Sequence, residues 1–427
     1  MLSERALIAR YFQRFAFGPK PGQFTEALKN GSAKTLSNIL TSTPNSPIAM
    51  PIFETLGPQP AIGAINRAEW GLKMQSQRNQ LVSWWLDQMV AVDNPFQERV
   101  VWFWHGHWAT SMDKVIYANA MFQQNKKFRE FGLGNFKFFA RKMIADGALQ
   151  YWLDNNSNTV KAPNENLARE LMELFTLGVN RYSEDDIKQA AKALTGYSLD
   201  RESGVVTFNA KKHDSADQTI LGRTSNFDGI SLVDLLVDQD NCPNFIAERL
   251  WFRFISDENP LPDNEIQSAF NDRDLSKAFN ALATHSGMSD EKNSMVKPPL
   301  EWFIAACRAL NILPSKIGKP ETILSFLEKI AQKPFYPPNV GGWPAGEIWL
   351  TAANAQYRLA LAQLIVNNGD ITPISKLPAY NRVAALTDFL GVNQWSQRSK
   401  SALVASQTNT SQLIITALCA PEYLVSA

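Results

Sequence analysis

The sequence predicts a mainly α-helical globular protein with one small β-hairpin near residues 198–209. Apolar residues recur every three to four positions along most of the 427 residues, which is the spacing that buries one face of a helix. Hydrophobic residues make up 45% of the chain, a fraction typical of globular proteins with a sizeable core. We expect one large helical domain over 1–427, with sub-domains 1–240 and 241–427 if it divides.

The first half of the chain begins with helical patterns. Leu7, Ile8, Tyr11 and Phe15 share one face of an N-terminal helix, and 66–92 reads as one or two buried helices. A further helix follows Pro95, with the sequence FQERVVWFWHGHW. Its inner turns are apolar on almost every side, which is typical of a helix in the middle of a bundle.

Two helices in the middle of the chain have clear start and stop signals. Asn164 can cap a helix that runs to about Leu177 and ends at Gly178. Ser183, followed by three acidic residues, starts a second helix, which Gly196 ends.

The hairpin prediction rests on 205–208, a β-branched and aromatic run directly after a Ser-Gly turn. Helical patterns then resume over most of the remaining chain. They cover 231–236, 243–256, 298–311, 321–332, 354–367, 381–390 and 410–419.

Charge and cysteine content exclude several classes of protein. The 42 basic and 41 acidic residues give a net charge of +1, which argues against a nucleic-acid partner. Cys242, Cys307 and Cys419 are odd in number and far apart, so we expect buried free thiols. No apolar run is long enough to span a membrane, and the N-terminal residues lack the apolar core of a signal peptide. A cytoplasmic location is therefore expected for the sequence as given.

Two of the four histidines, His105 and His107, stand between three tryptophans in VVWFWHGHW (100–108). Residues two apart on a helix point about 200° from each other, so a continuous helix keeps the two rings apart. They converge only if the helix ends there or the backbone extends, and Gly106 permits either. Both interpretations stay open: imidazoles packed in an aromatic core, or a catalytic His105 beside a metal ligand, His107.

The segment NENLARELMELFTLG (164–178) contains the other main candidates. Glu165, Arg169 and Glu173 recur at four-residue intervals, which predicts a ladder of ion pairs on one helix face. Glu165 and Arg169 are also candidate catalytic residues, with Glu165 as a general base or an orienting group.

Glu170 has no cation three or four positions away, and it falls within roughly 60° of Glu173 around the helix. Such a like-charged pair is unfavourable unless something positive lies opposite it. A buried arginine such as Arg249 or Arg253, or a metal ion, would serve.

His213 follows the predicted strand and precedes Asp214, a carboxylate that can fix a histidine tautomer. A metal ligand and a surface loop histidine are the two interpretations. Asp154 is a weaker candidate ligand, because its place before two asparagines already explains it as a turn residue. No phosphate-binding loop, dinucleotide fingerprint, serine-hydrolase elbow or zinc-protease motif occurs.

Nine segments of the chain resemble, in the same order, the blocks of one known bacterial family. They are RFAFGPKPG (14–22), NPFQERVVWFWHGHWATS (94–111), LQYWLDNNSN (149–158), NENLARELMELFTLGV (164–179), DDIKQAAKALTGYS (185–198), FNAKKHD (208–214), VKPPLEWF (296–303), PPNVGGWP (337–344) and APEYLVS (420–426). That family is known as domain of unknown function 1800, and the resemblance covers nearly the whole chain.

The resemblance implies a predominantly helical fold and no established activity. Many members look exported and are encoded beside an uncharacterised protein that resembles the alkaline phosphatase and sulfatase superfamily, which makes such a protein the expected partner. Phe175 stands where many relatives carry a histidine, so a metal site that needs that histidine cannot form here.

Two functions from different classes follow. In the first, the protein is a metal-dependent hydrolase in which His107, Glu170, Glu173 and His213 hold zinc, manganese or iron. In the second, it is a non-catalytic helical protein that binds the phosphatase-like partner or a cell-envelope polymer. A carbohydrate-active site with paired carboxylates and tryptophan platforms ranks third.

Overall fold

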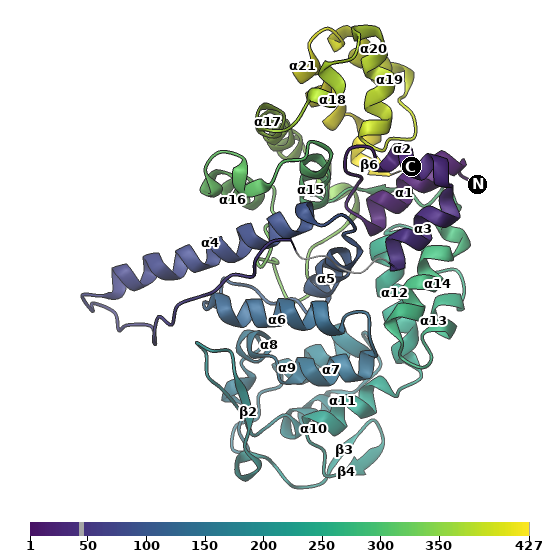
Figure 1. Cartoon of the computed structure of the whole chain (residues 1–427). Coiled ribbons are helices and arrows are strands. Elements are labelled where there is room, and N and C mark those ends of the chain that lie inside the picture. The colour runs from purple at the N-terminus through teal and green to yellow at the C-terminus, as the bar shows by residue number, and fades with distance from the viewer. Residues whose placement is uncertain (42–46, 427) are drawn as a thin grey trace.

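The computed structural model describes residues 1–41 and 47–426. The mainly α prediction is confirmed, since these residues form 22 α-helices and only three two-stranded antiparallel sheets. Helix α5 (Phe96–His107) lies at the centre, with α1, α12 and α15 around it (Figure 1). The long helix α4 (Arg67–Ala91) extends from the body (Figure 1).

The first half of the chain supplies α1 to α11. The remaining α-helices of this half are α1 Glu4–Phe15, α2 Gln23–Asn30, α3 Ser32–Thr41, α6 Ala118–Phe131, α7 Phe136–Ile144, α8 Gly147–Trp152, α9 Asn166–Glu170, α10 Glu184–Ala193 and α11 Gly229–Val237. Two hairpins lie between α10 and α11. They pair β1 Tyr197–Leu199 with β2 Val206–Phe208, and β3 Gln218–Ile220 with β4 Arg223–Ser225. The first confirms the predicted hairpin, and the second has no clear alternation in its sequence.

The second half is helical almost throughout. Its α-helices are α12 Asn241–Phe254, α13 Glu265–Ala269, α14 Leu275–Thr284, α15 Pro299–Ala309, α16 Pro320–Lys329, α17 Ala352–Asn368, α18 Thr372–Ser375, α19 Ala379–Phe389, α20 Gln397–Ser406, α21 Thr410–Leu418 and α22 Pro421–Leu424. Strand β5 (Met295–Val296) pairs with β6 (Val425–Ser426), which returns the end of the chain to the body beside α1. Short 3₁₀ turns are η1 Asn155–Ser157, η3 Ala210–Lys212, η4 Ser286–Ser289, η5 Pro314–Lys316 and η6 Gly346–Trp349.

The predicted start and stop signals act as expected around α10. The Ser183 hydroxyl accepts from the Asp186 N–H while the Asp186 carboxylate accepts from the Ser183 N–H, a complete capping box. Gly178 and Gly196 adopt φ of +86° and +91°, which side chains rarely tolerate, so these glycines end the preceding helical segments.

The predicted helix over 164–177 is only partly regular. Helix α9 stops at Glu170, and Leu171–Thr176 forms a π-helical segment, η2, in which the Thr176 hydroxyl donates to the Leu171 carbonyl. A π-turn widens the helix and changes which residues share a face. Spacing arguments built on 3.6 residues per turn therefore fail for residues on opposite sides of this segment.

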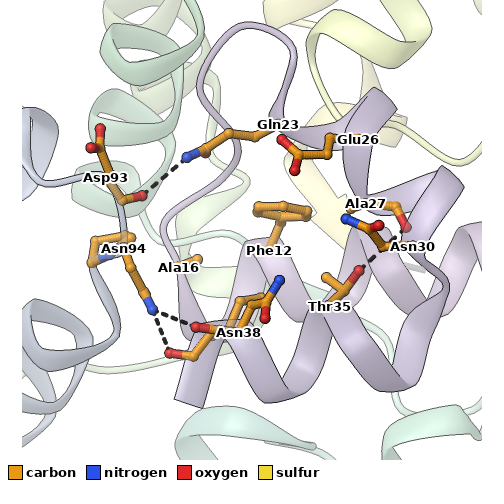
Figure 2. A pocket seen from close by; sticks show the side chains of 12 residues that line it. Phe12, Ala16, Gln23, Glu26, Ala27, Asn30, Thr35, Asn38, Asp93 and Asn94 are labelled. Atoms are coloured by element: carbon orange, nitrogen blue, oxygen red, sulfur yellow. Dashed lines mark hydrogen bonds between the residues drawn. The ribbon is translucent and has the colours of Figure 1, made fainter. Parts of the chain in front are cut away.

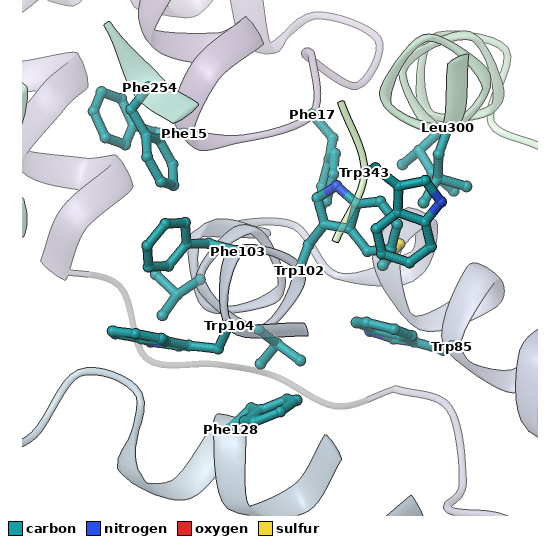
Figure 3. Close-up of a cluster of buried hydrophobic side chains, with 14 of the residues drawn as sticks. Phe15, Phe17, Trp85, Trp102, Phe103, Trp104, Phe128, Phe254, Leu300 and Trp343 are labelled. Carbon is teal, nitrogen blue, oxygen red and sulfur yellow. The ribbon is translucent and has the colours of Figure 1, made fainter. Parts of the chain in front are cut away.

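Buried apolar residues from both halves of the chain form one continuous core, and α5 is its aromatic centre. Figure 3 shows Trp102, Phe103 and Trp104 of α5 projecting to different sides among aromatic residues of other segments. Trp102 lies 4.6 Å from Trp343, ring centre to ring centre, and Trp104 lies 5.8 Å from Phe136. Because this helix is apolar on every side, it occupies the interior, as its sequence predicts.

No helix of 1–41 or 47–426 is long and apolar enough to cross a membrane. The three cysteines carry free thiols: Cys242 and Cys307 are buried, and Cys419 is partly buried.

Candidate functional site

His105 is buried in the aromatic core. Helix α5 continues through Gly106, so the two histidines point to different sides and do not converge. The His105 Nε2 accepts a hydrogen bond of 3.0 Å from the Phe335 N–H, and the ring packs against Trp85 and Trp343. Burial lowers the pKa of His105 to about 3, so the ring is neutral at physiological pH. A neutral ring fixes the Phe335 loop to α5.

His107 faces another part of the core, next to Phe175 and Phe245. Its Nε2 lies 3.1 Å from the Phe175 carbonyl, which can only accept, so Nε2 carries the proton. The other ring nitrogen, Nδ1, is buried without a hydrogen-bond partner among residues 1–41 and 47–426. Burial and the charge of Arg249 lower the pKa of His107 to about 3. The same positive charge also opposes a metal ion at this ring.

Arg169 is the centre of an exposed ion-pair cluster. Its guanidinium donates two hydrogen bonds of 2.8 Å to Glu184 of α10 and a longer one of 3.5 Å to Glu165. The predicted ladder is therefore half formed, because Glu173 does not join it. Glu173 instead accepts a hydrogen bond of 2.6 Å from the Tyr182 hydroxyl.

Glu170 is half-buried, and none of the ion pairs among the described residues includes it. Burial, reinforced by the charge of Glu173, raises the pKa of this carboxyl. Arg249, proposed above as a counter-ion, lines a cavity of about 310 Å³ together with Glu173, but the two side chains form no ion pair.

His213 lies far along the chain from these acids and packs against Phe208. Its Nδ1 lies 3.2 Å from the Thr195 carbonyl, and its Nε2 is buried with no hydrogen-bond partner in the part of the chain that the structure describes. A Cβ on Gly196 would lie 3.0 Å from the His213 Cβ, so the glycine lets the ring approach the end of the helical segment.

Only one group of three His, Cys, Asp or Glu ligand atoms lies within 4.8 Å in the described part of the chain. It consists of Asp263, Glu265 and His285, and by distance alone it could hold an ion. The four residues predicted as metal ligands form no such group. His285, which the sequence analysis set aside, is the one histidine in it.

Hydrogen bonding argues against a metal at His285. The Gly287 N–H donates to Nδ1 over 2.9 Å, so the proton of the neutral ring is on Nε2, which donates to Asp263 over 3.1 Å. A metal on Nε2 would need that nitrogen's lone pair and would place two N–H groups face to face at Nδ1. The group is better described as a hydrogen-bonded His-Asp pair.

The densest gathering of charged side chains lies elsewhere, at two adjoining cavities of about 30 and 40 Å³ beside α5. Both cavities are lined by Arg99, Arg253, Pro298 and Glu301. We call the two cavities together the cationic cleft. It is built where α1, α5, α12 and the start of α15 meet, and the 333–345 loop covers it.

Three arginines line the cationic cleft. Arg14 donates to the carbonyls of Phe254, Ile255 and Asn293 and to the Ser426 hydroxyl, and its Nε has no partner among the described residues. Arg99 lies over the ring of Phe254 and forms an ion pair with Glu301. Arg253 donates to carbonyls of the covering loop and has no ion-pair partner among the described residues.

Lys297 completes the lining and is 6% exposed. Its Nζ lies 3.7 Å from the centre of the Tyr423 ring, and no hydrogen bond or ion pair within 1–41 and 47–426 reaches it. Burial, with the charge of Arg358 acting in the same direction, lowers the pKa of Lys297 to about 7.

Positive charge exceeds negative charge around the cleft. Arg249 adds its charge from α12 and Arg358 from α17, whereas Glu301 and Asp257 are the carboxyls that act on the cations. Burial lowers the pKa of Arg253 to about 10, so its guanidinium stays charged at pH 7. Four cationic side chains and one carboxylate, Glu301, line the cleft, and Arg249, Arg358 and Asp257 act on them from outside this lining.

The covering loop fits closely against α5. Gly342, at φ +81°, approaches so near that a Cβ there would lie 2.2 Å from the Gly106 carbonyl oxygen. This close packing places Trp343 against Trp102, one wall of the smaller cavity (Figure 3). The indole N–H of Trp343 is a further buried donor in the wall, with no hydrogen-bond partner among the described residues.

A third cavity, of about 150 Å³, lies between α1, α2 and α3 and the turn after α4 (Figure 2). Its polar groups bond to one another: Gln23 donates to the Asp93 carbonyl, and Asn94 donates to the carbonyls of Asn38 and Ile39. No lysine or arginine lines it. These contacts fasten α2 and α3 to the turn and leave few free groups.

Sequence reasoning missed Arg14, Arg99, Lys297 and Glu301 as site residues. A signal was present for Arg14 and Lys297, which stand among apolar and aromatic residues in YFQRFAF and SMVKPP. A charged residue in an apolar run is rarely buried without a reason. The motif-bearing segments at 14–22, 94–111, 296–303 and 337–344 all contribute to the cleft.

Fold and site together define a mainly helical protein with a buried, cation-rich cleft. The family described as "Protein of unknown function (DUF1800)" matches residues 10–425, nearly the full length. The chain therefore belongs to this family, as the resemblance predicts. No curated protein and no solved structure matches it.

Proposed function

We propose that this protein binds a small oxyanion, a carboxylate or an inorganic phosphate or sulfate, in the cationic cleft. The observation that carries the proposal is a group of four cations from four separate segments: Arg14, Arg99, Arg253 and Lys297. Among the described residues, only Arg99 forms an ion pair, with Glu301. Burying charges without counter-ions costs several kcal/mol per ion, so an anion at this place would stabilise the fold as well as bind.

The chemistry of the cleft favours an oxyanion. Guanidinium groups donate pairs of parallel hydrogen bonds to carboxylate and phosphate oxygens, which gives geometric selectivity over a simple ion such as chloride. The free donors on Arg14 and Trp343 supply further bonds. At pH 7 about half of the Lys297 ammonium groups are charged, so anion affinity falls as the pH rises through 7.

The size of the cleft limits the ligand. Cavities of about 30 and 40 Å³ have room for only a few water molecules each, because one water molecule needs at least roughly 10–15 Å³. A small acid fits this space, or the acidic end of a larger molecule, whereas a nucleotide does not.

Calorimetric titration tests the proposal with acetate, pyruvate, lactate, phosphate and sulfate at constant ionic strength. We expect saturable binding to the unaltered protein and loss of binding in Arg253→Met, because that variant removes from both cavities a guanidinium that has no ion-pair partner among the described residues. The matched control is Arg169→Met, which removes an exposed arginine far from the cleft. Equal binding in all three proteins would overturn the proposal.

The metal-dependent hydrolase remains the second candidate, and one observation favours it. His107 and His213 each have one ring nitrogen next to a backbone carbonyl and the other buried without a partner, an arrangement typical of metal ligands. It ranks second because no third ligand atom completes a group around either ring in the described part of the chain.

Elemental analysis tests this second candidate. The hydrolase hypothesis predicts near-stoichiometric zinc, manganese or iron that is lost in His107→Ala and Glu170→Ala. Metal content that is unchanged in both variants would exclude this site. The phosphatase-like partner stays a prediction, which co-purification of the two proteins would test.

A further inference from the structure

Lys297 is held in place by its backbone, and its side chain is left free. Its N–H donates to the Leu424 carbonyl over 2.7 Å, and its carbonyl accepts from Arg358 over 3.0 Å. The following two prolines stiffen the chain before α15. The amine therefore occupies a fixed position at the cleft without a hydrogen-bond or ion-pair partner in the described residues.

The surroundings of the Lys297 amine favour its neutral form. Arg358 of α17 repels the ammonium, and the Tyr423 ring of α22 covers one side of it. Arg14, Arg99 and Arg253 line the same cavity, and Glu301 is the carboxyl that favours the ammonium. A desolvated lysine beside another cation is the arrangement in which an amine becomes a nucleophile at neutral pH.

We propose that Lys297 forms an imine with the carbonyl carbon of a small 2-oxo carboxylate whose carboxylate group is held by the arginines of the cationic cleft. This inference rests on the proposed anion site. It goes further, because it names the ligand class and the reacting atom. The class follows from the two kinds of group in one cavity: guanidinium groups for a carboxylate, and a free amine for a carbonyl.

The step balances without any further reagent. The amine nitrogen forms a bond to the carbonyl carbon, and the carbonyl oxygen takes up a proton to give a carbinolamine. The carbon–oxygen bond then breaks and one water leaves, with the protons carried by water or by Glu301, the carboxyl that lines both cavities. Water attack reverses the step, so the imine is in equilibrium with the free ligand.

Reductive trapping tests the inference on the full chain. The protein is incubated with pyruvate and cyanoborohydride, which reduces an imine to a stable secondary amine, and is then analysed by intact mass and peptide mapping. We expect one carboxyethyl group on Lys297 and none in Lys297→Met. Lys333→Met is the matched control, because Lys333 is half-buried and also lies over a tyrosine ring, but it is near the Glu328 carboxylate.

Lactate separates the failure of this inference from failure of the anion site. It carries the same carboxylate and has no carbonyl carbon to attack. Binding of both pyruvate and lactate without trapping would overturn the imine and leave the anion site standing. Binding of neither would overturn both. Equal modification of the unaltered protein and of Lys297→Met would also contradict the inference.

Discussion

Buried arginines occur in two very different settings in this protein. Arg308 of α15 is fully buried, and its guanidinium donates five hydrogen bonds to the carbonyls of Gly18, Met89, Val90, Val92 and Asp93. These bonds close the end of α4 and the turn after α1. Arg253 in the cationic cleft donates only to the covering loop and faces other cations.

The difference separates a structural arginine from one that is ready for a ligand. Five carbonyl oxygens accept from the three guanidinium nitrogens of Arg308, so its burial is compensated within the fold. The cleft arginines have few counter-ions, since only Arg99 forms an ion pair among the described residues, although each comes from a well-packed helix. Such a deficit is characteristic of binding sites, where stability is lower than the fold could reach.

Lowering the pH should give the largest change in the free energy of unfolding. This test asks whether the buried histidines of α5 are structural residues, as Arg308 is. His105 and His107 have a pKa of about 3 in the fold, well below the ordinary 6.5. The unfolded chain therefore binds more protons between these values, and stability falls as the pH falls through this window.

For the two histidines together we expect a loss of about 5 kcal/mol in the free energy of unfolding between pH 6 and pH 4. Urea unfolding at several pH values measures it, and His105→Gln should reduce the slope. An unchanged slope in that variant would show that His105 does not titrate as described.

Replacement of the structural arginine comes next. Arg308→Met leaves the five carbonyls without their donor in the core, and we expect a loss of about 3–5 kcal/mol in the free energy of unfolding. Chemical denaturation followed by tryptophan fluorescence measures the change. A loss below about 1 kcal/mol would remove the contrast with the cleft.

The covering loop supplies a third test. Gly342→Ala places a Cβ against the Gly106 carbonyl in a backbone conformation unsuited to alanine, which should cost about 2–4 kcal/mol and shift Trp343. Gly341→Ala is the control, since a Cβ there meets only the Asn339 side chain. Similar stability of the two variants would mean that the loop does not press on α5.

The ion pairs of Arg169 at the surface should give the smallest change in the free energy of unfolding. Arg169→Met breaks the bonds to Glu184 and Glu165 at a surface where water and salt screen them, so we expect a loss below about 1 kcal/mol. Thermal unfolding at low and high salt measures it. A larger, salt-independent loss would place Arg169 with the structural arginines.

Local sequence signals predict much of this fold and little of the site. The Ser183 cap, the glycines that end helical segments and the apolar character of α5 were all readable, because each acts within a few residues along the chain. The π-turn at Leu171–Thr176 was not, since helical spacing assumes a regular turn.

The cationic cleft depends on contacts between distant segments. Arg14 meets the end of α12, about 240 positions further along the chain, and Lys297 meets Tyr423. Histidines and acids attracted attention because their chemistry is familiar, yet His105 serves as a core acceptor. Cations inside apolar runs were the sequence signal that could have indicated the site.

The most direct test combines stability and binding in two variants. The free energy of unfolding is measured for Arg308→Met and Arg253→Met, with and without saturating pyruvate or phosphate, because a bound ligand adds stability in proportion to its occupancy. The account predicts that Arg308→Met is less stable but keeps the full ligand increment, whereas Arg253→Met is as stable as the unaltered protein and loses it. An equal increment in both variants would contradict the account.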